Sequence, residues 1–64
     1  MKTWPKRNIF KDDVDKAGGL SKAANSAGFS EKTFREYYDG SRTPHWISMP
    51  GIAIGLGYES NRYQ

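Results

Sequence analysis

The chain has 64 residues, a net charge of +3 and no cysteine. This length allows one small domain, and the lack of cysteine excludes a disulfide framework or a thiolate metal site. The basic N-terminus is not followed by the apolar run of a signal peptide, and no stretch approaches the ~20 apolar residues of a membrane span. We therefore expect a soluble cytoplasmic protein that does not interact with membranes.

Positive charge is concentrated at the start of the chain. Residues 1–8 contain Lys2, Lys6 and Arg7 and no acidic residue, which predicts a basic N-terminal arm. Acidic residues outnumber basic ones in the next segment, and the charges balance over residues 18–40. The modest net charge is by itself a weak indication of a polyanionic partner.

A first helix is predicted over residues 9–17. Apolar residues recur there close to helical spacing, at Ile9, Phe10, Val14 and Ala17. Asn8 is the expected N-cap, and the glycine pair at 18–19 is expected to end the helix.

Two further short helices are predicted over residues 20–27 and 31–38. The first is rich in alanine and is followed by Gly28, a residue that tolerates the left-handed conformation common at helix ends. Ser30 stands where the N-cap of the second belongs, and the Asp-Gly pair at 39–40 ends it. These two helices are separated by only a short turn.

A fourth helix is predicted after the turn at residues 41–44. It is expected to begin near Ser48, which places Pro50 in the tolerant first turn, and to end at residues 56–57. The tail over residues 58–64 is expected to be only partly ordered. Because no useful period-2 alternation is present, the sequence predicts an all-α, compact bundle of four or five short helices.

Residues 20–39 meet the requirements of a helix-turn-helix motif, which needs small residues at a steep helix crossing and a turn that tolerates positive φ. Ala24 is expected at the crossing and Gly28 in the turn. The apolar anchors of the two helices are Ala23, Ala27, Phe29, Phe34 and Tyr37.

The stretches LSKAANSAGFSEKTFREYYDGSRTP and IAIGLGYE resemble the Cro and lambda-repressor-like helix-turn-helix family. The resemblance covers residues 9–59, with a basic arm before it and a tail over 60–64. It rests on several spaced positions: Ala24, Gly28, Gly40, Pro44, Ala53, Leu56 and Gly57. Two departures fall in the fourth helix, namely the Pro-Gly pair at 50–51 and Gly55, which costs about 1 kcal/mol relative to alanine.

The resemblance implies a sequence-specific transcription regulator of Cro-like phage-repressor type, with its third helix in the major groove of double-stranded operator DNA. Arg35 could then contact guanine, and Glu31 or Glu36 could accept from a cytosine amino group. The implied base-reading residues are Ser30, Glu31, Lys32, Thr33, Arg35 and Glu36. The expected phosphate contacts are Lys2, Lys6, Arg7, Lys22 and Arg42.

Several roles stay open at this level. The segment around Trp4 could be an arm that follows the DNA, or Trp4 could cap the core with the basic residues in solvent. Trp46 and Tyr58 could form a homodimer contact, although a small domain needs its aromatic residues for its core. The exposed side of the third helix could also be an ordinary solvated face.

An enzyme is not expected, because the chain has a single histidine, His45, next to a proline, and neither a cysteine nucleophile nor a phosphate-binding glycine loop. No cofactor, metal or small-molecule ligand is expected either. The alternative function, of a different class, is a protein-interaction module on the same fold, such as an anti-repressor or an antitoxin. A recombination directionality factor is a further alternative within small basic helical folds.

Overall fold

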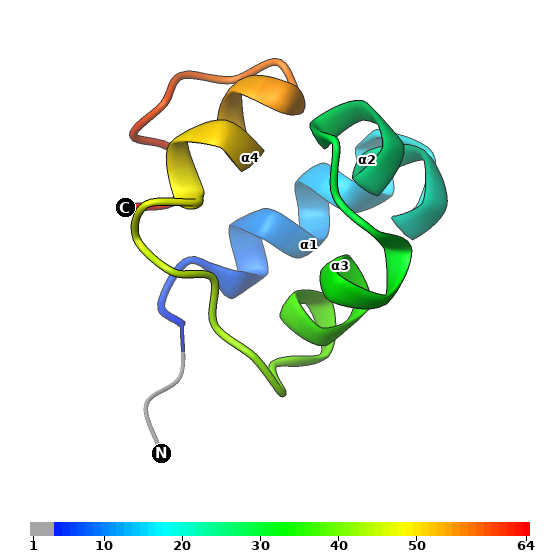
Figure 1. Cartoon of the computed structure of the whole chain (residues 1–64), viewed down its shortest axis with the longest axis horizontal. Coiled ribbons are helices and arrows are strands. Elements are labelled where there is room, and N and C mark those ends of the chain that lie inside the picture. The colour runs from blue at the N-terminus through cyan, green and yellow to red at the C-terminus, as the bar shows by residue number, and fades with distance from the viewer. Residues whose placement is uncertain (1–3) are drawn as a thin grey trace.

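The computed structural model describes residues 4–64, and the segment it describes contains four helices and no strand. The helices are α1 (Arg7–Lys16), α2 (Leu20–Ala27), α3 (Glu31–Asp39) and α4 (Met49–Gly55). In Figure 1, α1 crosses the centre of the molecule, with α2, α3 and α4 arranged around it. The predicted all-α class is confirmed. None of these helices combines the length and the apolar character that a membrane crossing requires.

The start of α1 differs from its prediction. The helix begins at Arg7, so Asn8 lies inside it and is not the N-cap. A turn precedes the helix, in which the Arg7 amide donates to the Trp4 carbonyl at 3.1 Å. Pro5 fits this turn because its ring fixes φ at a value that suits both a turn and a helix start. The predicted basic arm is therefore, from Trp4 onward, part of the folded domain.

The connection between α2 and α3 has the predicted form. Gly28 adopts a φ of 77°, and the amide of Phe29 donates back to the Ala24 carbonyl at 2.9 Å. This left-handed residue closes α2 at little steric cost because glycine has no Cβ. Ser30 then caps α3, since its Oγ accepts from the Thr33 amide at 3.2 Å. The predicted bounds of α2 are confirmed, and α3 extends one residue further, to Asp39.

The core is built around aromatic side chains from both ends of the chain and from α1 and α3. Phe10 and Phe34 are fully buried with ring centroids 5.1 Å apart, and Trp4 packs 5.3 Å from Phe10. The inward face of α1 consists of Phe10, Asp13 and Val14, at the i, i+3, i+4 spacing of one helix stripe. Ile9 and Ala17, which were expected on this face, are exposed, and Ala17 is the C-cap residue after the helix.

The end of the chain also belongs to the core, contrary to the expectation of a partly ordered tail. Only 1% of Tyr63 is exposed, and its ring packs 5.7 Å from both Trp4 and Phe10. The Trp4 indole Nε1 donates to the Tyr63 carbonyl oxygen at 3.3 Å. Trp4 therefore has the core role, and the two ends of the folded chain are joined to each other.

Helix α4 begins after Ser48 as predicted, with Pro50 in its first turn. A Cβ at Gly55 would lie 2.5 Å from the Ala27 Cα, so glycine is needed for the close approach of α4 to α2. The Ser26 Oγ donates to the Gly55 carbonyl at 2.7 Å across the same contact. Packing thus explains why Gly55, a residue of low helix propensity, stands within α4.

Candidate nucleic-acid interface

Helix α3 has one buried side and one exposed side. Phe34 and Tyr37 are buried in the core and fix the helix from behind, as predicted. The predicted base-reading residues reach the surface to differing degrees: Ser30, Glu31, Lys32 and Arg35 are exposed, and Thr33 and Glu36 are half-buried. The sequence therefore folds so that these six residues lie along the side of α3 that is accessible to a partner.

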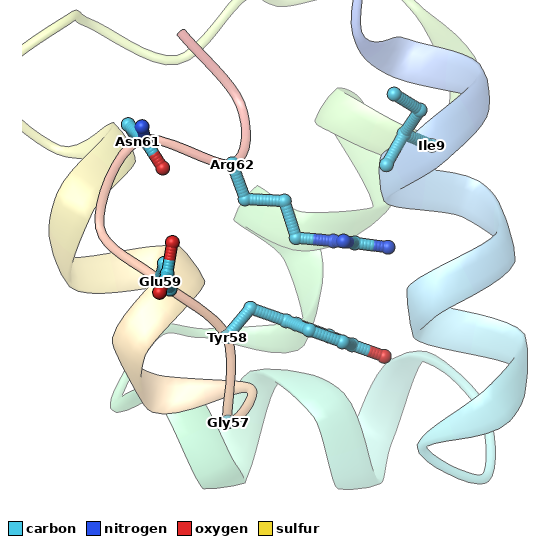
Figure 2. Close-up of a pocket in the computed structure, with 6 residues that line it drawn as sticks. All are labelled: Ile9, Gly57, Tyr58, Glu59, Asn61 and Arg62. Atoms are coloured by element: carbon cyan, nitrogen blue, oxygen red, sulfur yellow. The ribbon is translucent and has the colours of Figure 1, made fainter.

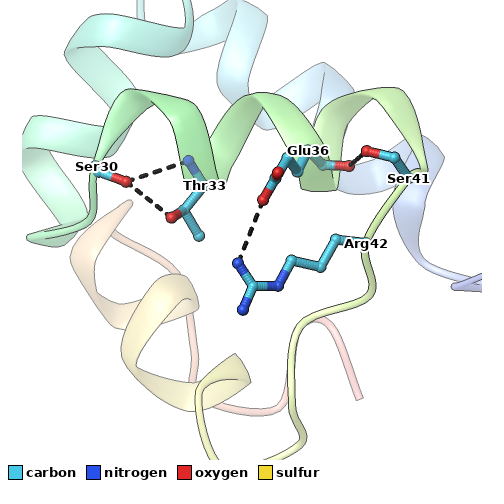
Figure 3. A network of polar contacts seen from close by, with 5 residues as sticks. All are labelled: Ser30, Thr33, Glu36, Ser41 and Arg42. Carbon is cyan, nitrogen blue, oxygen red and sulfur yellow. Dashed lines mark hydrogen bonds and ion pairs between the residues drawn. The ribbon is translucent and has the colours of Figure 1, made fainter.

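The first turn of α3 uses part of its polar chemistry for its own stability. Ser30 Oγ donates to the Thr33 Oγ1 at 2.8 Å while accepting from the Thr33 amide (Figure 3). Such a cap contributes about 1 kcal/mol to helix stability. These two side chains consequently hold the start of α3 in place, and the Thr33 hydroxyl keeps its capacity to donate.

Two carboxylates of α3 are paired with arginines. Arg35 Nη2 lies 2.7 Å from the Glu31 carboxylate one turn earlier, and Arg42 Nη1 lies 3.2 Å from Glu36. The side chains of Glu31, Arg35 and Arg42 are exposed, and that of Glu36 is 36% exposed. Pairs that water can reach in this way contribute only about 0–1 kcal/mol because water screens them. Each arginine can thus exchange its carboxylate for another anionic partner at small cost.

Arg42 reaches α3 through the turn that follows the helix. The Arg42 amide donates to the Glu36 carbonyl at 3.2 Å, and the Ser41 hydroxyl donates to the same oxygen at 3.4 Å. Figure 3 shows the Arg42 side chain extending back beside α3 toward the Glu36 carboxylate. The predicted phosphate contact is therefore brought next to the predicted base-reading residues.

The other predicted phosphate contacts have different positions. Lys22 is exposed on α2 and Lys6 is half-buried before α1, whereas Lys2 lies outside the described residues. Arg7 is half-buried, and its Nη1 donates to the Tyr38 carbonyl at 2.8 Å near the end of α3. A cation at this position interacts favourably with the negative end of the α3 helix dipole. Arg7 therefore has a structural role that the sequence did not indicate.

A second polar cluster joins α1 to the end of the chain. The Asp13 carboxylate is buried and accepts from Arg62 Nε at 2.6 Å, Arg62 Nη2 at 2.9 Å and the Tyr63 hydroxyl at 2.7 Å. Burial alone would raise the pKa of Asp13, but the hydrogen bonds from Arg62 and Tyr63 outweigh it and hold the pKa below its ordinary value. Burial and the bond to Asp13 raise the pKa of Tyr63, which therefore stays a donor.

The sequence analysis did not single out Asp13, which lies with Asp12 and Asp15 in the acidic segment that follows the basic N-terminus. The available signal was its spacing, since position 13 lies between Phe10 and Val14 on the inward stripe. Its partner could not be read from local pattern, because Arg62 is 49 residues away.

A surface hollow with a volume of about 750 Å³ lies beside this cluster. It is lined by Ile9, Gly57, Tyr58, Glu59, Asn61 and Arg62. Figure 2 shows the Tyr58 and Arg62 side chains extending side by side toward α1, and the guanidinium lies 4.0 Å from the Tyr58 ring centre. Arg62 is already paired with Asp13, so its positive charge in this hollow is compensated. Among residues 4–64 there is no group of three His, Cys, Asp or Glu side chains that could hold a metal ion.

No protein-family model matches the chain, and no curated protein or solved structure resembles it closely enough to be identified as a relative. The Cro-like resemblance therefore stays a prediction based on the chain's own residues.

Proposed function

We propose that the protein is a sequence-specific DNA-binding transcription regulator of Cro-like repressor type, in which α2 and α3 form a helix-turn-helix. The observation that carries the proposal is the form of α3. It is a short capped helix whose buried side is anchored by Phe34 and Tyr37 and whose accessible side carries the six predicted base-reading residues. An α-helix presented in this way fits the major groove of B-form DNA.

In this proposal Arg35 leaves Glu31 and forms two hydrogen bonds to a guanine edge, while Lys32 contacts a second guanine or a phosphate. The freed Glu31 and the neighbouring Glu36 can accept from cytosine amino groups. Because the ion pairs that break are exposed, their loss costs little compared with the roughly 1–3 kcal/mol that a good bidentate base contact contributes to discrimination.

Phosphate binding is assigned to the basic residues around α3. Arg42 lies beside the helix and can turn from the Glu36 carboxylate to the DNA backbone. Lys22 on α2 and Lys6 before α1 carry further positive charge. Such contacts would supply the sequence-independent part of the affinity. A regulator of this type would act in the cytoplasm, in agreement with the absence of cysteine.

A protein-interaction module is the second candidate, and one observation favours it. The paired charges leave α3 close to neutral, so the helix itself attracts a polyanion only weakly. An anti-repressor, an antitoxin or a recombination directionality factor could use such a surface. Salt separates the candidates, since DNA affinity falls by about 0.9 log units per log unit of salt for each phosphate contact.

The deciding experiment selects bound sequences from a random pool of DNA duplexes at physiological salt. We expect one enriched motif, and Arg35→Ala should relax one or two of its base pairs by about 1–3 kcal/mol. Arg42→Ala should instead weaken binding to all sequences alike. Lys16→Ala is the matched control, because it removes one exposed positive charge that is not among the predicted DNA contacts. A pool that shows no enrichment would contradict the proposal.

A further inference from the structure

Tyr38, near the end of α3, contacts α1 with its backbone and with its side chain. Its carbonyl oxygen accepts from Arg7 Nη1 at 2.8 Å. Its ring lies beneath Lys11, whose Nζ is 5.3 Å from the ring centre, and its hydroxyl donates to Asp15 Oδ1 at 3.0 Å. Arg7, Lys11 and Asp15 are four residues apart along α1, so they lie on one side of that helix. The end of α3 is thus fixed along one side of α1.

The Arg7 side chain also lies against the turn that follows α3. A Cβ placed on Gly40 would lie 3.2 Å from Arg7 Nε and 3.3 Å from Arg7 Cδ, so the Gly40 backbone packs directly on this side chain. Gly40 has a φ of 85°, and its amide donates to the Glu36 carbonyl at 3.1 Å. Glycine suits both the left-handed backbone and the close approach. Arg7 therefore contacts the last turn of α3 and the residue that ends it.

The same turn carries Arg42, two residues beyond Gly40. The Arg42 amide donates to the Glu36 carbonyl at 3.2 Å, which ties its backbone to the last turn of α3. Its side chain extends back beside the helix toward the Glu36 carboxylate (Figure 3). The reach of the Arg42 guanidinium therefore depends on the direction in which the chain leaves α3. That direction is fixed where Gly40 packs on Arg7.

Arg7 is committed to contacts within the protein. It is half-buried, its Nη1 is bonded to the Tyr38 carbonyl, and Gly40 covers the side chain at Nε. We propose that Arg7 is a positioning residue for phosphate binding, which holds the turn after α3 so that Arg42 reaches the DNA backbone. This inference rests on the proposed function, and it gives a different role to one of the phosphate contacts predicted from the sequence.

The shape of the side chain separates this role from a direct phosphate contact. A planar guanidinium can donate from Nη1 to the Tyr38 carbonyl while its Nε edge supports Gly40, whereas lysine offers the same charge on a single ammonium group. A phosphate contact depends mainly on the charge, which Arg7→Lys keeps. A positioning residue depends on the shape, which Arg7→Lys removes.

The first measurement needs no DNA and follows amide hydrogen exchange in the full chain by NMR. Arg7→Lys should speed exchange of the Gly40 and Arg42 amides by about tenfold, while the amides within α2 keep their wild-type rates and so report that the fold is intact. Lys16→Arg is the matched control, because it makes the reverse exchange at an exposed position of α1. Unchanged rates at both amides in Arg7→Lys would overturn the proposal.

The second measurement is the affinity for a selected duplex at physiological salt. Arg7→Lys should weaken binding by about three- to tenfold although it keeps the charge, and by no more than Arg42→Ala does. In an Arg42→Ala background the same change should alter affinity by less than about twofold, because the residue that Arg7 positions is absent.

Losses that multiply in the double variant would show that Arg7 acts on DNA independently of Arg42 and would overturn the proposal. Wild-type affinity in Arg7→Lys would overturn it as well. The two measurements also keep the two proposals apart. If the wild type selects no duplex, the proposed function fails, while the exchange rates still decide whether Arg7 fixes the turn after α3.

Discussion

The Asp13 cluster and the two ion pairs of α3 are built from the same kinds of side chain, but the first carboxylate is buried and the other two are at the surface. Asp13 is buried and receives three hydrogen bonds from the end of the chain. Glu31 and Glu36, on α3, are paired with arginines at the surface. In the first cluster the carboxylate has no alternative partner, whereas in the second each charge remains accessible to water and to other molecules.

This difference assigns different roles to the two clusters. A buried carboxylate that loses its partners keeps the full cost of its desolvation, so the Asp13 cluster fixes the fold. An exposed pair is nearly neutral in free energy, so the α3 pairs can be exchanged when a partner arrives. The same residue types therefore belong to the scaffold on one side of the protein and to the candidate interface on the other.

The largest effect is expected from Asp13→Ala. This change removes three hydrogen bonds and leaves the Tyr63 hydroxyl without its acceptor, which should lower the free energy of unfolding by about 3 kcal/mol. Urea denaturation measures the change. Asp12→Ala, at an exposed neighbour on α1, is the control and should shift stability by less than about 0.5 kcal/mol. Equal effects of the two variants would break the distinction between buried and exposed acids.

The support of α3 from within is tested by Ala24→Leu. Ala24 is buried on α2, which packs against both α3 and α4, so three extra carbon atoms must displace the elements around it. We expect a loss of about 1–3 kcal/mol in the free energy of unfolding, seen as a lower melting temperature. The exposed Asn25→Leu is the control. An unchanged melting temperature for Ala24→Leu would contradict the packing of the two helices.

The pH dependence of stability should follow Asp13. Since the fold lowers the pKa of Asp13, its contribution is complete above the unfolded value of about 3.8 and is lost as pH falls through the lower folded value. Urea midpoints between pH 6 and pH 2 should therefore fall more steeply for the wild type than for Asp13→Asn. Parallel curves for the two proteins would show that another group controls acid unfolding.

The smallest effect on stability is expected from Glu36→Gln. Because the pair with Arg42 is exposed, the free energy of unfolding should change by less than about 0.5 kcal/mol. The same change should raise affinity for duplexes without the selected motif several-fold, since it removes a negative charge beside the proposed phosphate contact. Glu59→Gln, at an exposed acid after α4, is the matched control for net charge. A large loss of stability would show that Glu36 stabilises the fold and is not freely exchangeable.

Local pattern predicted the parts of the fold that local chemistry determines. Gly28 and Ser30 marked the turn before α3, and both have the backbone role expected of them. The spacing of Phe34 and Tyr37 likewise identified the buried side of α3, and with it the accessible side. These features depend on residues that are neighbours along the chain.

The contacts between distant residues could not be predicted in the same way. Tyr63 packs on Trp4 across 59 positions, and no periodicity connects the two residues. The burial of Asp13 depends on the same end of the chain, so it was hidden within an acidic stretch. The role of Arg7 beside the end of α3 is equally non-local. The candidate interface was therefore easier to read from the sequence than the scaffold that supports it.

The contact between Gly55 and Ala27 has a consequence for how the chain can vary. Where α2 and α4 meet, Ala27 contributes a methyl group and Gly55 contributes no side chain. Any side chain at position 55 would push α4 away from α2 and so change its position relative to the rest of the domain. Substitutions at positions 27 and 55 must therefore keep the combined volume of the two side chains unchanged.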